Sequence, residues 1–513
     1  MLRRACLVAA ILLLSLPAFT QNIDDFAKKL TVKTFANGLT VLIYERHEAP
    51  VFSYTRMVDV GDTQDPMGAS GLAHMFEHMA FKGTEDIGTT NYATEKLALD
   101  REEKAYEAYD AERRKRVGAD PAKVKELYKA FEAAAEDAHK YVIPNQFTEI
   151  LEREGAVGVN AYTSMDETAY LFSMPSNRLE LWAYMEADRM AHPVFREFYK
   201  ERDVVLEERR MRVDSNPNGR MVEQFQAAAY VAHPYHRSGI GWPSEVTSLT
   251  ATQAKTFYKK YYTPSNTVIA LVGDIYPKEA MPLLEKYFGA LPTEPKPSDL
   301  DIAEPPQFDT RSVVIHDKAQ PIYIEGYHRP DYRDPDDAVY DVIEDLISNG
   351  RTSRLYRSLV RDQHIAAYAA GFTGFPGHKY PNLFALYGVP MPGHKPDEIA
   401  DGIHKEIERL KNEDVTDDEL QMIKTRFRAQ LIESLGSNEG LAQSLAQLQL
   451  RYGDWKQLFG EIDRTQKVTK ADIRRVANKV FVASNRTTAE ILTITPTQKP
   501  VQQNPGENTQ EQQ

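Results

Sequence analysis

The chain has 513 residues, of which 42% are hydrophobic and 27% are charged, and its formal net charge is −13. This length exceeds what one hydrophobic core usually supports, so we expect at least two domains. The acidic charge argues against nucleic-acid binding, because a phosphate backbone is bound by an excess of lysine and arginine.

The first twenty residues have the layout of an export signal. Arg3 and Arg4 precede the apolar run ACLVAAILLLSLPAF, and polar sequence begins at Gln21. Because the run is short for a membrane span, we predict a signal peptide over residues 1–20; an uncleaved membrane anchor is the alternative. Cleavage removes two arginines and changes the net charge to −15. We expect a periplasmic or secreted protein with no stable membrane insertion after cleavage.

The only cysteine, Cys6, lies inside this signal. The mature chain therefore has neither disulfides nor thiolate ligands. Any metal ion must be bound by histidine, aspartate or glutamate.

The mature chain begins with strand patterns. The segment TVKTFANGLTVLIYER alternates in polarity around Asn37–Gly38, which predicts a hairpin, and VFSYTRMVDVG predicts a third strand. The turn-rich loop DTQDPMGASG then leads into a helix within GLAHMFEHMAFKGT, residues 71–84.

Residues 95–142 differ in composition from their surroundings. They are rich in Ala, Glu, Lys and Arg, with one Gly-Ala-Asp-Pro break at 118–121. This pattern predicts two solvated helices that form a long hairpin insertion. A partner or substrate contact and a plain structural insertion are the two readings of its role.

The rest of the first half alternates strands and helices. GAVGVNAYTSMDETAYLFSM predicts two strands, helices follow at about 177–191 and 196–213, and NTVIALVGDI predicts another strand. The Pro-rich, acidic segment over residues 292–307 predicts a linker, so the first domain should span residues 21–291.

The second half repeats the order of strand, Asp-Pro loop, helix and glycine, which predicts a second domain of the same fold over residues 308–498. Aligned on Gly83 and Gly350, the positions of His74, Glu77 and His78 are taken by Asp341, Glu344 and Asp345. We therefore expect a second domain without a metal site and one metal ion per chain. The polar residues 499–513 predict a disordered tail.

Two histidines one helical turn apart suggest a metal site. His78 lies about 40° round the helix from His74, so both imidazoles can bind one ion. Glu77 lies beside them in the order H-x-x-E-H, where its carboxylate can act on a bound water. The alternative is a helix whose polar side chains are only solvated or capped.

A catalytic zinc site needs a third protein ligand, and without cysteine a carboxylate is the natural choice. In YKERDVVLEERRMRV we expect Val204, Val205 and Met211 to form a buried apolar stripe. Glu201 and Glu208 fall on the same stripe, and a buried carboxylate is unfavourable unless it is paired or metal-bound.

We assign Glu208 as the third ligand and Glu201 as a supporting carboxylate that orients a ligand histidine or adds charge to the site. Glu207 is rotated by about 100° and belongs to the charged face. A structural ion pair with a nearby arginine is the alternative for the two glutamates.

These motifs together resemble the pitrilysin/insulysin family of zinc peptidases, and most of all its two-domain bacterial relatives of mitochondrial processing peptidase. The resemblance covers roughly residues 31–495 and is carried by NGLTVLI, GLAHMFEHMAFKGT, NAYTSMDETAY, ERDVVLEE, AHPYHRSGIGWPSEV and YYTPSNTVIALVGD. It implies an α+β fold: two homologous domains, each with a mixed or antiparallel sheet covered by helices, joined by the linker as a clamshell.

The resemblance also implies roles for individual residues. One Zn²⁺ would be bound by His74, His78 and Glu208, with Glu77 as general base and Glu201 in support. An edge strand would hold the peptide by backbone pairing near the scissile bond, through Asn160, Ala161 and Tyr162.

In the second half, LYRSLVRDQHIAAYAAGF resembles the family's Arg-then-Tyr signature, which closes over the substrate and identifies Arg361 and Tyr368 as catalytic candidates. The alternative is a surface charge and a strand aromatic. One departure from the family is the spacing of 130 residues between His78 and Glu208. The excess over relatives matches the hairpin at 95–142, and we expect the site to survive that insertion.

The resulting hypothesis is an exported zinc endopeptidase that cleaves peptides or unfolded polypeptide segments. We expect it to form a homodimer, or a heterodimer with a related peptidase-like subunit. The alternatives are a non-catalytic subunit of a two-protein peptidase complex and, more remotely, a zinc hydrolase acting on a non-peptide substrate.

Overall fold

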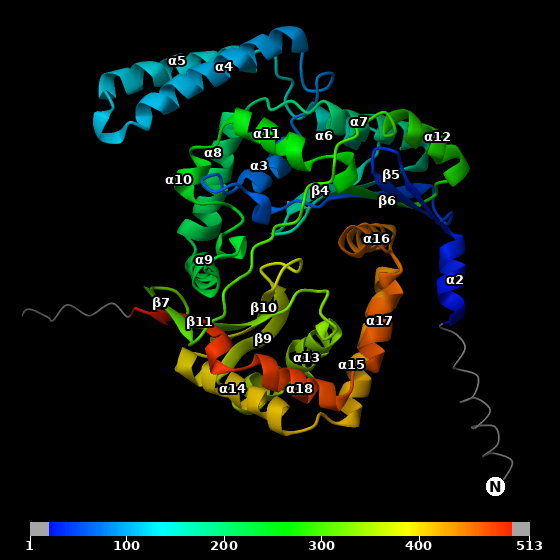
Figure 1. Ribbon diagram of the computed structural model, residues 1–513, viewed down its shortest axis with the longest axis vertical. Coiled ribbons are helices and arrows are strands. Elements are labelled where there is room, and N and C mark those ends of the chain that lie inside the picture. Colours follow the sequence, from blue (N-terminus) through cyan, green and yellow to red (C-terminus); the bar gives the residue numbers. More distant parts are fainter. Residues whose placement is uncertain (1–19, 495–513) are drawn as a thin grey trace, which may run out of the picture.

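The computed structural model describes residues 20–494, which form two sheets with helices on both faces of each (Figure 1). Residues 1–19 of the predicted signal peptide and the predicted tail at 499–513 lie outside the described residues. Within the described chain, no helix has both the length and the hydrophobicity needed to cross a bilayer. The predicted α+β class with two mixed sheets is confirmed.

The first sheet has six strands in the order β1-β2-β6-β3-β5-β4. Only β2 and β6 run parallel, and the other neighbours are antiparallel. The apolar run of β6 is wholly buried, as expected of a central strand, whereas β4 lies at the edge and is partly exposed. The bounds are β1 Leu30–Thr34, β2 Thr40–Glu45, β3 Val51–Val58, β4 Val157–Thr163, β5 Thr168–Pro175 and β6 Thr267–Gly273.

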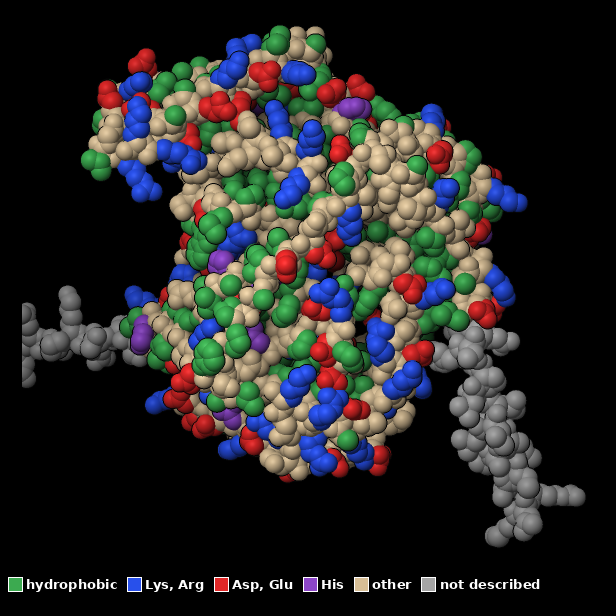
Figure 2. Space-filling view, viewed as in Figure 1, with side chains coloured by type: hydrophobic (Ala, Val, Ile, Leu, Met, Phe, Trp, Pro, Cys, Tyr) green, Lys and Arg blue, Asp and Glu red, His purple; other side chains and the backbone are tan. Residues whose placement is uncertain are grey.

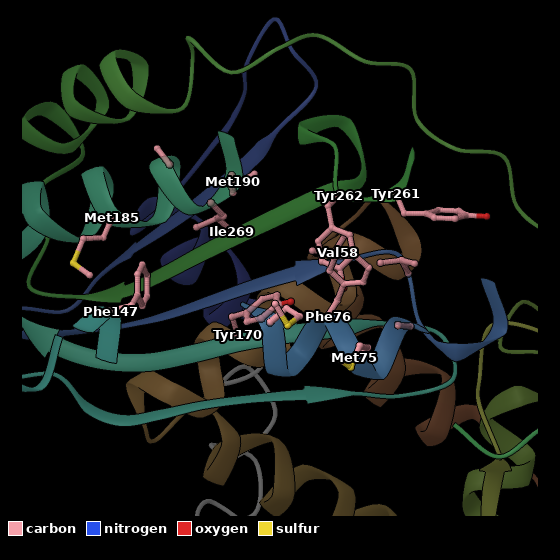
Figure 3. Packing of buried hydrophobic residues seen from close by; sticks show 14 of the residues in the cluster. Val58, Met75, Phe76, Phe147, Tyr170, Met185, Met190, Tyr261, Tyr262 and Ile269 are labelled. Atoms are coloured by element: carbon pink, nitrogen blue, oxygen red, sulfur yellow. The ribbon is translucent and has the colours of Figure 1, made fainter. Parts of the chain in front are cut away.

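One face of this sheet is covered by helices of the first half. Figure 3 shows Met75 and Phe76 of α3 packed beside Val58 of β3 and Tyr170 of β5. The helices of the first half, apart from the hairpin, are α2 Thr20–Lys28, α3 Leu72–Met79, α6 Gln146–Arg153, α7 Leu179–Ala191, α8 Phe198–Arg209, α9 Pro217–Ala229, α10 Pro243–Val246, α11 Ala251–Tyr261 and α12 Pro277–Tyr287.

The predicted hairpin consists of α4 (Tyr92–Arg113) and α5 (Pro121–His139). Asn91 caps α4 by accepting a hydrogen bond from the N–H of Thr94, and Asp120 caps α5, with proline as the first helical residue. The hairpin overhangs the rest of the molecule at the upper left of Figure 2.

The second sheet has five strands in the order β7-β11-β8-β10-β9, with only β7 and β11 parallel. Its strands are β7 Arg311–Asp317, β8 Ile322–Arg329, β9 Ala366–Phe375, β10 Asn382–Pro390 and β11 Arg486–Thr493. Its helices are α13 Asp337–Ser348, α14 Pro396–Asn412, α15 Asp417–Ser434, α16 Asn438–Tyr452, α17 Gln457–Lys467 and α18 Lys470–Val480.

Each half places one helix on the sheet of the other half. Helix α16 follows the second sheet's helices in sequence, yet it packs Leu441 and Leu445 against the free face of the first sheet. Helix α9 of the first half packs Met221 and Phe225 against the second sheet. Residues 292–310, which include the predicted linker, connect the halves without a helix or strand.

Candidate metal centre

Gly71 and Asp65 fix the N-terminus of α3, the helix that carries the two histidines. Gly71, the residue before the helix, has φ +86°, and a Cβ there would lie 2.8 Å from the carbonyl oxygen of Ile240. The carboxylate of Asp65 accepts hydrogen bonds from the N–H groups of Gly71, Leu72 and Ala73 at 2.7, 3.2 and 2.8 Å. An anion is favoured at these free N–H groups, so Asp65 anchors the helix.

Three possible ligand atoms from α3 and α8 converge beside the first sheet. Oε2 of Glu208 lies 3.2 Å from Nε2 of His74 and 3.3 Å from Nε2 of His78. All three ligand atoms lie within 4.8 Å of one another. Two imidazole nitrogens and one carboxylate oxygen are a donor set that zinc accepts in catalytic sites, so these residues fit the ion.

The charge state of Glu208 suits a ligand. The hydrogen bond from His74 lowers the pKa of Glu208 to about 2, so the carboxylate is ionised at neutral pH, as metal binding requires. Its other oxygen, Oε1, lies 2.8 Å from the guanidinium of Arg212. By contrast, Glu207 is exposed and pairs with Arg210 at 2.6 Å, on the charged face where the sequence placed it.

The predicted buried stripe of α8 is wrong for two of its three members. Val205 is fully buried, but Val204 is 46% exposed, and Met211, in the π-helical turn η4 (Arg210–Asp214), is 58% exposed. The helix buries aromatic side chains and arginine stems where we expected aliphatic ones, at Phe198, Tyr199, Arg202 and Arg209. Glu201 and Glu208 therefore lie on a partly exposed face.

Glu201 holds the ring of His78. Its Oε1 lies 3.0 Å from Nδ1 of His78, which leaves Nε2 of the same ring toward Glu208. Burial opposes ionisation of Glu201, but hydrogen bonds from His78 and Lys82 outweigh it and lower the pKa of this carboxyl. A carboxylate bonded to the far nitrogen of a ligand histidine fixes its tautomer and orientation.

Lys82 is a residue of this centre that the sequence analysis missed. Its Nζ lies 2.6 Å from Glu201 and 3.3 Å from Glu197, so it bridges two carboxylates. Glu197 also lies 3.2 Å from His139 of the hairpin. The available signal was spacing, because Lys82 continues the four-residue interval that separates His74 from His78.

Glu77 lies on the other side of the histidines. Its Oε2 is 3.8 Å from Nδ1 of His74, and its side chain is 21% exposed. The carboxylate is therefore close to the ligand group and still open to a water molecule.

The edge strand β4 contains Asn160, Ala161 and Tyr162, which pair with Leu171, Tyr170 and Ala169 of β5. Within the described residues no strand covers the other edge of β4, and α3 contacts this strand. The open edge thus lies beside the helix with the two histidines. The hydroxyl of Tyr162 accepts a hydrogen bond from Gln443 of α16 at 3.3 Å.

Arg361 and Tyr368 lie in the second half of the chain and do not take part in the hydrogen bonds around His74, His78 and Glu208. Arg361 is in the π-helical segment η7 (Tyr356–Asp362), and its side chain, 57% exposed, pairs with Asp362 at 2.6 Å. Tyr368 is on β9, the edge strand of the second sheet, and is 52% exposed, with its ring 5.6 Å from that of Tyr387. In the described chain neither residue hydrogen-bonds to the metal group.

Comparison with known families accounts for both halves. Residues 40–110 and 134–241 match the insulinase family, peptidase family M16, and residues 248–427 match the peptidase M16 inactive domain. The break between 110 and 134 falls in the hairpin. The chain therefore belongs to peptidase family M16. It is a zinc protease of that family, with His74, His78 and Glu208 as its candidate metal group.

Individual relatives agree over most of the chain. The zinc protease PqqE of Helicobacter pylori is 27% identical over 500 residues, 94% of this chain and 96% of that protein. A probable mitochondrial-processing peptidase subunit beta of Arabidopsis thaliana is 22% identical over 467 residues, 88% of this chain and 76% of that protein.

Solved structures show the same fold. The crystal structure of a protease from Helicobacter pylori superposes with a TM-score of 0.75 at 26% identity, covering 90% of this chain and 99% of that one. The periplasmic protease PqqL from Escherichia coli gives a TM-score of 0.66 at 19% identity, over 91% of this chain and 48% of that one, a likeness of fold alone.

Proposed function

We propose that this M16 zinc protease is an exported endopeptidase that cleaves peptides or unfolded polypeptide segments. The observation that carries the proposal is the convergence of three zinc-compatible ligand atoms beside both a free carboxylate, Glu77, and the open edge of β4. These are the parts that peptide hydrolysis needs: a metal site, a proton acceptor and a surface for extended chain.

His74, His78 and Glu208 would hold the zinc ion, and Glu201 would keep His78 in the ligating orientation. When bound there, the ion would supply Lewis-acid chemistry: it would polarise the attacking water and the substrate carbonyl and lower the pKa of the water toward about 7. Glu77 accepts the proton released by the attacking water and passes it to the leaving amine nitrogen.

An extended substrate would add to the first sheet along the free edge of β4. Backbone groups of this strand would pair with the peptide at Asn160, Ala161 and Tyr162, so binding would be largely independent of side-chain sequence. The exposed amide of Asn160 is then available near the scissile bond. A folded protein cannot offer a free extended segment, which restricts the substrates to peptides and unfolded chain.

The second half would complete the site by closing over the substrate as in a clamshell. Tyr368 has a half-exposed side chain whose hydroxyl could donate to the developing oxyanion, and Arg361 has an exposed side chain whose guanidinium, now paired with Asp362, could bind a substrate carbonyl or carboxylate.

Export to the periplasm, or secretion, rests on the signal-like sequence of residues 1–20. The Escherichia coli relative described as periplasmic has the same fold, which is compatible with this proposal. We further propose that the chain acts as a dimer, with itself or with a related peptidase-like subunit.

The test is a mixed peptide library incubated with the purified mature protein, with cleavage sites determined by mass spectrometry. We expect cleavage within peptides, its loss with a chelator and its recovery on adding zinc, while a folded protein of similar composition stays intact. Cleavage that persists in chelator, or cleavage confined to chain ends, would refute a zinc endopeptidase. Light scattering would test the dimer. Separation of the periplasmic and secreted fractions from the cytoplasm would test the export.

A further inference from the structure

A cavity of about 600 Å³ lies between the hairpin and the beginning of α8, separate from the metal centre. Figure 1 shows the hairpin lying across the outer side of the first half, above α8. Aromatic rings from all three helices line the cavity. The rings of Tyr106, Phe131 and Tyr199 are 4.0–5.2 Å apart, and Tyr109 and Tyr128 extend this wall.

One lining residue has no partner. Glu102 of α4 is only 6% exposed and lies where this cavity meets a smaller one of about 170 Å³. Among the described residues, nothing hydrogen-bonds or forms an ion pair with it. Burial, and then the nearby carboxylates of Glu103 and Glu197, raise the pKa of Glu102 to about 7. The carboxylate oxygens of Glu102 are not completely enclosed, so a ligand in the cavity can reach them. A largely buried carboxylate without a donor is unfavourable.

The cations that line the cavity are already engaged elsewhere. Arg202 donates to the hydroxyl of Tyr106 at 2.6 Å and to a backbone carbonyl, and its guanidinium carbon lies 5.0 Å from the centre of the Tyr106 ring. Lys200 pairs with Glu197 at 2.9 Å, and Arg113 pairs with Asp110. Lys96 and Lys255, which line the smaller cavity, form no ion pair with Glu102 either, so a ligand is the remaining source of a positive charge in contact with it.

We propose that this cavity binds a protonated alkylamine, with its ammonium group hydrogen-bonded to Glu102 and its hydrocarbon chain against the aromatic wall. A carboxylate supplies the acceptor that an ammonium N–H requires, and aromatic faces attract both the charge and the chain. A hard metal cation fits less well, because among the described residues the carboxylates around this cavity do not bring three ligand atoms together, as only His74, His78 and Glu208 do. The choice of an alkylamine follows from the carboxylate of Glu102 and the aromatic wall of the cavity. It does not depend on the proposed peptidase activity.

The test compares n-pentylamine with 1-pentanol, which has the same chain and no charge, by calorimetry and ligand-observed NMR on the full mature protein. At a pH of about 8 most Glu102 carboxyls are ionised while the amine stays protonated. We expect millimolar binding of the amine and binding of the alcohol at least about tenfold weaker.

Two variants locate the site. Glu102→Gln should weaken amine binding by about tenfold or more, since it removes a charged acceptor. This variant keeps the side-chain volume and removes an unpaired buried charge, so it should fold. Glu107→Gln makes the same change at an exposed position of the same helix and should leave binding unchanged.

Equal affinity for amine and alcohol would overturn the proposal, as would equal amine affinity of the wild type and Glu102→Gln, or absence of binding at millimolar concentrations. The comparison of amine with alcohol needs no variant, so it decides the question even if Glu102→Gln does not fold. Peptidase activity is not a readout, so failure here and failure of the proposed function are separate results.

Discussion

Each histidine of α3 uses its two ring nitrogens for different partners. In both rings Nε2 lies toward Glu208, while Nδ1 lies toward Glu77 in His74 and toward Glu201 in His78. The carboxylates around the rings therefore differ in position and in role. Glu208 faces both Nε2 atoms, Glu201 holds one ring from behind, and Glu77 stays beside the group without a strong bond.

The role of Glu77 as proton acceptor predicts a separation of metal binding from catalysis. Glu77→Gln should keep zinc but lower kcat by about 100- to 10,000-fold, because an amide cannot accept the proton of the attacking water. Zinc content measured by atomic absorption and peptide cleavage measured on the same sample check this. A variant that keeps most of its activity would remove Glu77 as the base.

Glu208 and its neighbour Glu207 form a matched pair of tests. Glu208→Gln should weaken zinc binding by more than the ~10- to 100-fold typical of losing an outer hydrogen-bond partner, because a direct ligand is lost. Glu207→Gln, which removes the same charge from an exposed ion pair, should leave zinc affinity unchanged. Competition with a fluorescent chelator measures both, and the reverse order would transfer the ligand role to Glu207.

At the scale of elements, α8 connects the metal centre with the hairpin. Its partly exposed face carries Glu201 and Glu208, and at its beginning Glu197 contacts both Lys82 and His139 of α5. A series of ion pairs thus runs from the hairpin through Glu197, Lys82 and Glu201 to His78. The position of α8 relative to α3 decides whether the ligand atoms converge.

Lys82→Met should therefore weaken zinc binding, by about tenfold, because Glu201 loses the cation that holds it against His78. Lys200→Met is the matched control: Lys200 also pairs with Glu197, but it is 68% exposed and makes no bond to Glu201. Lys82→Arg should restore part of the affinity. If both methionine variants bind zinc as tightly as the wild type, Lys82 has no positioning role.

On the scale of the whole molecule, the exchange of α9 and α16 joins the two halves. Each sheet has one face buried by a helix from the other half, so neither half has a complete core alone. Bringing α16 under the first sheet also places Gln443 beside Tyr162 of the edge strand. The halves should consequently unfold together.

Leu445→Ala tests this coupling, because Leu445 belongs to the second half by sequence but is fully buried on the first sheet. We expect a loss of about 2–5 kcal/mol in the free energy of unfolding, from lost burial and the cavity left behind. Calorimetry should show a single transition at lower temperature, whereas Leu97→Ala, at a 59% exposed position, should change little. Two transitions, with only one of them shifted, would show that the halves unfold independently.

Much of the fold could be predicted from the chain itself. Strand alternation, the Asn37–Gly38 turn and the composition of residues 95–142 each correspond to an element of the structure, because these signals act between near neighbours. The H-x-x-E-H spacing likewise places two imidazoles on one face of α3. The same reasoning misjudged Val204 and Met211, because helical periodicity gives relative directions but not which direction faces the core.

The sequence by itself determined the elements, their order and the two histidines of the candidate metal group, since these depend on local spacing. Tertiary structure decided how closely Glu208, expected from its spacing on the helix, approaches both rings, that Lys82 bridges Glu197 and Glu201, and which helices cover which sheet. It also decided that Glu102, largely buried, lines a cavity without a hydrogen-bond or ion-pair partner among the described residues. Such features arise between residues far apart in the chain, and only packing brings those residues together.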